Sequence, residues 1–122
     1  MIIKTVNVSV PYVTSFESIL NALQKDEIIK FIDEQIEYWH KTYPNESFSA
    51  LALFGKTRFK DWSVTPLDFL WKQNMKRFEN DREKAYRQSG IDIGYLLKWR
   101  CAVSPHYIKI TKGFTLNYTF LR

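Results

Sequence analysis

The sequence predicts an α+β domain in which a curved, barrel-like, mostly antiparallel sheet packs against two N-terminal helices and one long central helix. Apolar and polar residues alternate near the N-terminus and again in the last quarter of the chain, as in strands with one buried face. Between these regions, apolar residues recur at helical spacing. With 122 residues the chain can bury one core, so we expect a single domain over residues 1–122.

The N-terminal region is expected to form one strand and two helices. Valines alternate with polar residues up to Pro11, which predicts a strand over residues 2–10. A short helix over residues 15–23 follows, because a threonine and a glutamate stand at capping-box spacing. A second helix is expected to begin at Asp26 and to end at Pro44, because apolar residues recur at helical spacing: Ile28, Ile32, Ile36, Trp39 and Tyr43.

The middle of the chain is expected to form a hairpin and then the long helix. Residues 47–54 and 57–64 are predicted strands, joined by a turn at a glycine. Thr65–Asp68 combines a capping hydroxyl, a proline at the first helical position and a carboxylate near the positive end of a helix. This motif predicts a helix that continues to Gln88, and Ser89-Gly90 is the expected stop.

The last quarter is expected to return to strands. Alternation predicts a strand over residues 97–103, which ends at Ser104-Pro105. Residues 107–111 and 114–121 are expected to pair as a hairpin around Lys112-Gly113. One side of these strands should lie in the core, including Trp99, Cys101, Ile108, Ile110, Phe114, Leu116, Tyr118 and Phe120. The other side should face outward, and it carries Lys98, Arg100, Tyr107, Lys109, Thr111, Thr115, Asn117 and Thr119.

The excess positive charge lies entirely in this last quarter. Residues 93–122 contain five lysines and arginines and no acid, which accounts for the net charge of +5. RNA binding requires cations for phosphates, aromatic faces for stacking and polar groups that read base edges. We therefore predict an RNA-binding face, whose principal contacts are Lys98, Arg100, Tyr107, Lys109, Lys112 and Asn117. Arg58 and Lys60 are secondary candidates for contact with RNA. The alternative is an ordinary solvated sheet face, on which lysines discourage edge pairing.

The remaining residues give no catalytic signature. His40 is expected to interact favourably with a helix C-terminus. His106, in the turn at Ser104-Pro105, could serve as a base in RNA cleavage, but no second histidine is expected beside it. Cys101 is expected to be buried. The acids are expected on exposed helix faces, including Asp33, Glu34 and Glu37, and we predict no metal site, no cofactor and no enzymatic activity.

The composition indicates a folded protein of a reducing compartment. One cysteine cannot form an intramolecular disulfide, and the N-terminus alternates where a signal peptide would be continuously apolar. No segment is apolar enough to span a membrane. We therefore expect a cytoplasmic protein without a membrane anchor.

The start of the chain resembles that of a known class of RNA-binding proteins. The strand Val6-Asn7-Val8-Ser9-Val10-Pro11 followed by the helix Ser15–Leu23 resembles the opening of PUA-like and ASCH-like barrels. The ASCH branch has a motif of glycine, lysine, glutamate and arginine linked to RNA cleavage, whereas Asn21–Ile28 lacks the glycine and the arginine. The resemblance therefore implies an RNA-binding protein without cleavage activity.

In size and character the chain also resembles the small PUA-like regulators carried by pheromone-responsive conjugative plasmids of Gram-positive bacteria. That resemblance implies a cytoplasmic protein that binds transcript RNA and dampens expression of a plasmid operon. A rival resemblance is to RelE-like toxins, which cleave messenger RNA, although the helix over residues 66–88 departs from their order of elements. A protein-binding module that uses the acidic helices, Tyr12 or Tyr38 is a third alternative.

Overall fold

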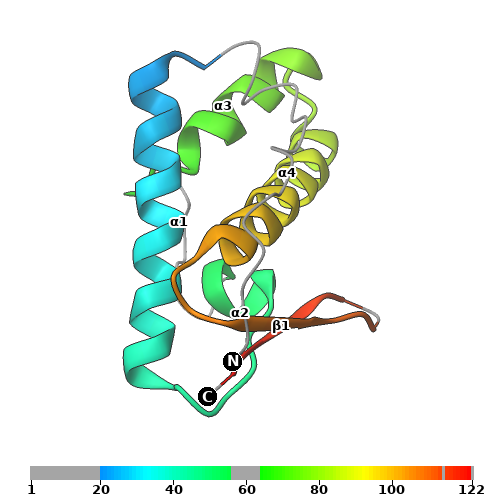
Figure 1. Cartoon of the computed structure of the whole chain (residues 1–122). Helices are drawn as coiled ribbons and strands as arrows, with labels where there is room; N and C mark the ends of the chain where they lie inside the picture. The colour runs from blue at the N-terminus through cyan, green and yellow to red at the C-terminus, as the bar shows by residue number, and fades with distance from the viewer. Residues whose placement is uncertain (1–19, 56–63, 114, 122) are drawn as a thin grey trace.

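The computed structural model describes residues 20–55, 64–113 and 115–121, and this part of the chain is mostly helical (Figure 1). It contains four helices and two strands, in the order α1 (Ala22–Thr42), α2 (Ala50–Phe54), α3 (Asp68–Arg77), α4 (Arg82–Val103), β1 (Ile108–Thr111) and β2 (Asn117–Phe120). The strands form one open, two-stranded sheet. The predicted α+β class with a barrel-like sheet is therefore wrong. Within the described ranges, no helix is long and apolar enough to cross a membrane.

Helix α1 confirms the second predicted helix and extends it at its N-terminal end. Asn21 caps it, because its side chain accepts a hydrogen bond from the Gln24 N–H at 2.8 Å and its own N–H donates to the Gln24 side chain at 3.0 Å. Ile28, Ile32 and Ile36 are buried, as their spacing predicted. The strand over residues 2–10 and most of the helix over residues 15–23 lie outside the described residues.

The predicted strand over residues 47–54 is wrong, because most of it forms the short helix α2. The Ser49 side chain accepts from the Ala52 N–H at 3.2 Å and so begins a helix of alanines, leucines and one phenylalanine. Only Phe48 pairs as a strand residue, in an isolated antiparallel bridge to Tyr118. The predicted partner strand falls mostly on residues 56–63, outside the described part of the chain.

The predicted long helix begins two residues later than expected, at Asp68 after the N-cap Leu67, and it is two helices. The Thr65 hydroxyl accepts from the Leu67 N–H at 3.2 Å, and α3 follows directly. The chain then reverses through Glu79 and Asn80, which adopt positive φ angles of 54° and 66°. Asp81 caps the next helix, since its carboxylate accepts from the Lys84 N–H at 3.1 Å.

Helix α4 continues through the predicted stop and through the predicted strand over residues 97–103, so both predictions are wrong. The Ser89 hydroxyl donates to the Ala85 carbonyl at 2.7 Å, and it is therefore satisfied inside the helix. Further along, the buried residues follow helical spacing: Ile93, Leu96, Leu97 and Cys101. The predicted break at Ser104-Pro105 is real, but it ends a helix.

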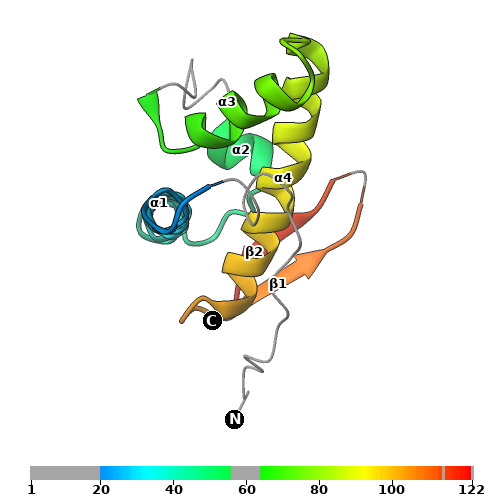
Figure 2. The ribbon, with the colours of Figure 1, turned by 90° about the horizontal axis from the view of Figure 1, so that it is seen from above.

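The terminal hairpin is confirmed. Strands β1 and β2 are antiparallel, with Ile108 opposite Phe120 and Ile110 opposite Tyr118. In Figures 1 and 2 the hairpin lies at the C-terminal end of α4, whereas α3 lies at its N-terminal end. Tyr118 and Phe120 are buried against the ring of Phe48, with ring centroids 5.4 and 5.5 Å from it.

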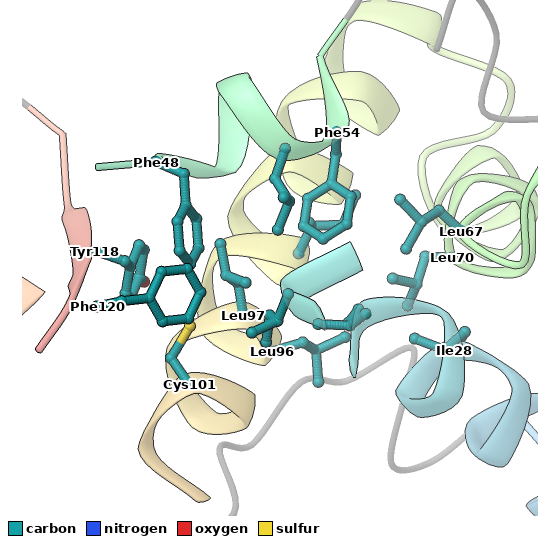
Figure 3. Packing of buried hydrophobic residues seen from close by; sticks show 14 of the residues in the cluster. Ile28, Phe48, Phe54, Leu67, Leu70, Leu96, Leu97, Cys101, Tyr118 and Phe120 are labelled. Atoms are coloured by element: carbon teal, nitrogen blue, oxygen red, sulfur yellow. The ribbon is translucent and has the colours of Figure 1, made fainter. Parts of the chain in front are cut away.

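The hydrophobic core runs continuously between these two ends of the molecule. Figure 3 shows the aromatic side chains at the hairpin, the leucines and Cys101 of α4 in the middle, and Leu67, Leu70 and Ile28 on the far side. The predicted inward set of the hairpin is therefore confirmed for the residues that the structure describes; Phe114 is not one of them.

Candidate functional sites

The terminal hairpin presents a polar outer face. Because Lys109 lies opposite Thr119 and Thr111 opposite Asn117, these four side chains share the side away from the core. Tyr107 stands directly before β1, two residues from Lys109, so the same alternation places it on the outer side. The Leu121 N–H donates a hydrogen bond to the Tyr107 carbonyl at 2.8 Å, which holds the backbone of Tyr107 beside the end of β2. Four of the predicted site residues therefore lie exposed on one small unit: Tyr107, Lys109, Lys112 and Asn117. We call these four the hairpin face.

Lys98 and Arg100 are placed differently from the prediction, because they lie on α4 and not on a strand. Lys98 is exposed. Arg100 is half-buried, and its guanidinium donates to both carboxylate oxygens of Asp33 on α1, at 2.8 and 2.7 Å. This bidentate ion pair occupies the guanidinium N–H groups that could otherwise bind a phosphate. Arg100 is therefore a link between α1 and α4, and Arg58 and Lys60 lie outside the described residues.

The lysines of the hairpin face differ from Arg100 in their electrostatic surroundings. Among the described residues, neither Lys109 nor Lys112 forms an ion pair. The strands and the turn between them also contain no Asp or Glu. A phosphate that approached this surface would therefore meet two uncompensated cations.

A second group of functional side chains lies where α1 meets the turn after α4. His40, near the end of α1, stacks on His106, with ring centroids 3.9 Å apart and an angle of 23° between the rings. His106 Nε2 donates a hydrogen bond to the Glu37 carboxylate at 2.5 Å. Phe120 presents its ring edge-on to both imidazoles, at 4.8 and 5.6 Å. The expectation that no second histidine stands beside His106 is wrong.

The sequence interpretation missed this group, which we call the histidine cluster (Glu37, His40 and His106). Glu37 and His106 are 69 positions apart, and they meet only because residues 97–103 are helical and return the chain to the end of α1. The one local signal was the spacing of three between Glu37 and His40, which places both on one face of a helix. Glu37 and Asp33 were expected to be plainly exposed, but both contact the C-terminal part of the chain.

Two further polar features belong to the core. Asn74 on α3 is fully buried, and its amide donates to the Ser89 hydroxyl and to the Asp92 carboxylate of α4, both at 3.0 Å. Burial raises the pKa of the Tyr118 hydroxyl well above its usual value, and nearby Cys101 adds to the shift. Cys101 is buried, as predicted, although it lies on a helix.

Comparisons of this chain with models of protein families, with characterised proteins and with solved structures found no match. The interpretation of both sites therefore depends on the chemistry of the chain's own residues.

Proposed function

We propose that the protein binds RNA without cleaving it, and that the hairpin face is the contact surface. The observation that carries this proposal is the pair of exposed lysines on an acid-free hairpin, with an exposed tyrosine and an asparagine on the same unit. These side chains match the three needs of a surface that binds unpaired RNA: charge, a stacking surface and hydrogen bonding.

Each residue of the hairpin face has a distinct role in the proposal. Lys109 and Lys112 neutralise phosphates, which supplies affinity without sequence selection. Tyr107 is 40% exposed and offers a ring on which one base can stack. Within the described ranges, the one hydrogen bond of the Asn117 amide is a long one, 3.4 Å to the Thr115 carbonyl, so the amide can exchange that contact for a base edge.

The rigid backing of the hairpin also favours this surface. The inner side of the hairpin is held by Tyr118 and Phe120, which are buried in the core. The outer edge of β2 is held by the antiparallel bridge between Phe48 and Tyr118 and by a hydrogen bond between the Ser47 and Thr119 hydroxyls at 2.7 Å. Lys109 and Asn117 lie on strands that are fixed in this way, so their backbone loses little conformational freedom when RNA binds.

A mobility assay with labelled single-stranded RNA over a range of salt concentrations tests the proposal. Each phosphate neutralised on a single strand contributes about −0.7 to the slope of log affinity against log salt, so Lys109 and Lys112 together should contribute about −1.4. Replacing both lysines by glutamine should remove that part of the slope. Replacing the exposed helix residues Lys76 and Lys84 by glutamine is the matched control and should leave the slope unchanged.

A second variant separates stacking from charge. Tyr107→Leu should weaken binding by about 1–3 kcal/mol, which is the usual contribution of one stacked base, and should leave the salt slope unchanged. The RNA recovered from each complex should be intact. Shortened RNA that disappears with His106→Ala would contradict binding without cleavage, and equal slopes for the wild type and the double glutamine variant would exclude the hairpin face.

A further inference from the structure

The histidine cluster has the composition and the compactness of a metal site. One ligand atom from each of Glu37, His40 and His106 lies within 4.8 Å of the other two. In a tetrahedral zinc site, ligand atoms about 2.0–2.1 Å from the ion stand roughly 3.3 Å from one another. The three side chains are therefore close enough to share an ion once the two stacked imidazole rings turn their nitrogens toward it.

The backbone holds these ligands in place. Glu37 and His40 stand three residues apart on α1, the spacing by which a glutamate and a histidine on one helix bind the same metal in helical bundles. His106 is fixed by the turn after α4, where its N–H donates to the Ser104 hydroxyl at 3.1 Å. The edge-on ring of Phe120, which is buried on β2, closes one side of the cluster.

The polar contacts of the cluster are incomplete. The hydrogen bond between His106 and Glu37 gives two of the three side chains a polar partner. His40 is half-buried, and its ring forms no hydrogen bond or ion pair with any residue in the described ranges, although it faces a second imidazole and a carboxylate. A shared cation would give one imidazole nitrogen of His40 a partner within the protein.

We propose that Glu37, His40 and His106 bind one zinc ion. Two imidazoles and one carboxylate are a donor set that zinc accepts, and they leave a fourth position for water. The ion would join the C-terminal end of α1 to the turn that leads into β1, two segments that meet at the hairpin end of the molecule (Figure 1). Zinc binding would then stabilise the folded state by linkage. This proposal does not depend on RNA binding.

Calorimetric titration of the full chain with zinc chloride tests the site. The protein should carry no histidine tag and should be treated with a chelator beforehand. One zinc ion should bind per chain, and the melting temperature should rise with zinc concentration. His40→Gln should weaken binding by more than about 100-fold, because even the outer partners of metal ligands contribute about 10–100-fold.

The control is chosen from the same helix. Glu34→Gln removes one carboxylate from α1, at a side chain that is 58% exposed and outside the cluster, and it should bind zinc as the wild type does. His40→Gln is the decisive variant, because it removes no hydrogen bond found among the described residues, so its fold should be retained. Absence of one-to-one binding by the wild type, or equal affinity of the two variants, would overturn the proposal.

Discussion

Asn74 joins α3 to α4 from inside the core, and its replacement by alanine should destabilise the protein strongly. Asn74 has no exposed surface, and it donates to Asp92, a carboxylate that is itself only 3% exposed. In Asn74→Ala, Asp92 keeps the hydrogen bond from Gln88 at 2.8 Å but loses the one that crosses between the helices. A hydrogen bond to a charged group contributes about 1.5–3 kcal/mol, and the small cavity adds to the loss. We expect the free energy of unfolding to fall by about 2–4 kcal/mol.

Urea denaturation followed by circular dichroism measures this change. With a denaturant slope of about 2 kcal/mol per molar, the midpoint should fall by about 1–2 M. Asn117→Ala, at an exposed asparagine, is the control and should change stability by less than about 0.5 kcal/mol. If Asn74→Ala and Asn117→Ala have the same midpoint, the contact between α3 and α4 does not depend on this hydrogen-bond network.

Three further changes test other parts of the fold. Arg100→Gln should lower the free energy of unfolding by about 1 kcal/mol, because it breaks a partly exposed ion pair with Asp33. In a double-mutant cycle, the loss for Arg100→Gln combined with Asp33→Asn should be smaller than the sum of the two single losses. Glu79→Gly should raise stability by about 0.5–1 kcal/mol in urea denaturation, since its φ of 54° favours glycine. Burial raises the pKa of Tyr118, so the folded state keeps a proton that the unfolded chain releases. Stability should therefore fall above about pH 10 by up to about 1.4 kcal/mol per pH unit, and the fall should disappear in Tyr118→Phe but remain in Tyr107→Phe.

Elements with local signals could be predicted from the sequence. The isoleucine stripe of α1 and the terminal hairpin depend on residues close together in the chain, and both are confirmed. The alternation in the last quarter misled the prediction only over residues 97–103. Leu97, Trp99 and Cys101 are two residues apart, which suits one face of a strand. Leu97 and Cys101 are also four residues apart, which is the spacing of a buried helix face. Both periods fit so short a run, and packing against α1 decided between them.

The turn between α3 and α4 was missed because it lacks glycine and proline, and Asn80-Asp81 was its one local signal, as a residue that tolerates positive φ followed by a helix cap. Glu79 and Asn80 take the left-handed conformation that usually requires glycine, so the sequence looks continuously helical there. The exposure of Tyr107, Lys109, Lys112 and Asn117 on the hairpin was predicted correctly because the register of a hairpin is local. The histidine cluster and the pairing of Arg100 with Asp33 depend on the path of α4, which the predicted strand replaced.

Charge reversal on the hairpin face is the most direct test of the proposed function. The affinity of Lys109→Glu combined with Lys112→Glu for single-stranded RNA at low salt should be compared with that of the wild type and of Lys76→Glu combined with Lys84→Glu. Both double variants change the net charge equally, so a nonspecific effect of total charge would weaken them alike. We predict that only reversal on the hairpin abolishes binding. Equal affinity of the two double variants would contradict the assignment of the hairpin face as the RNA-binding surface.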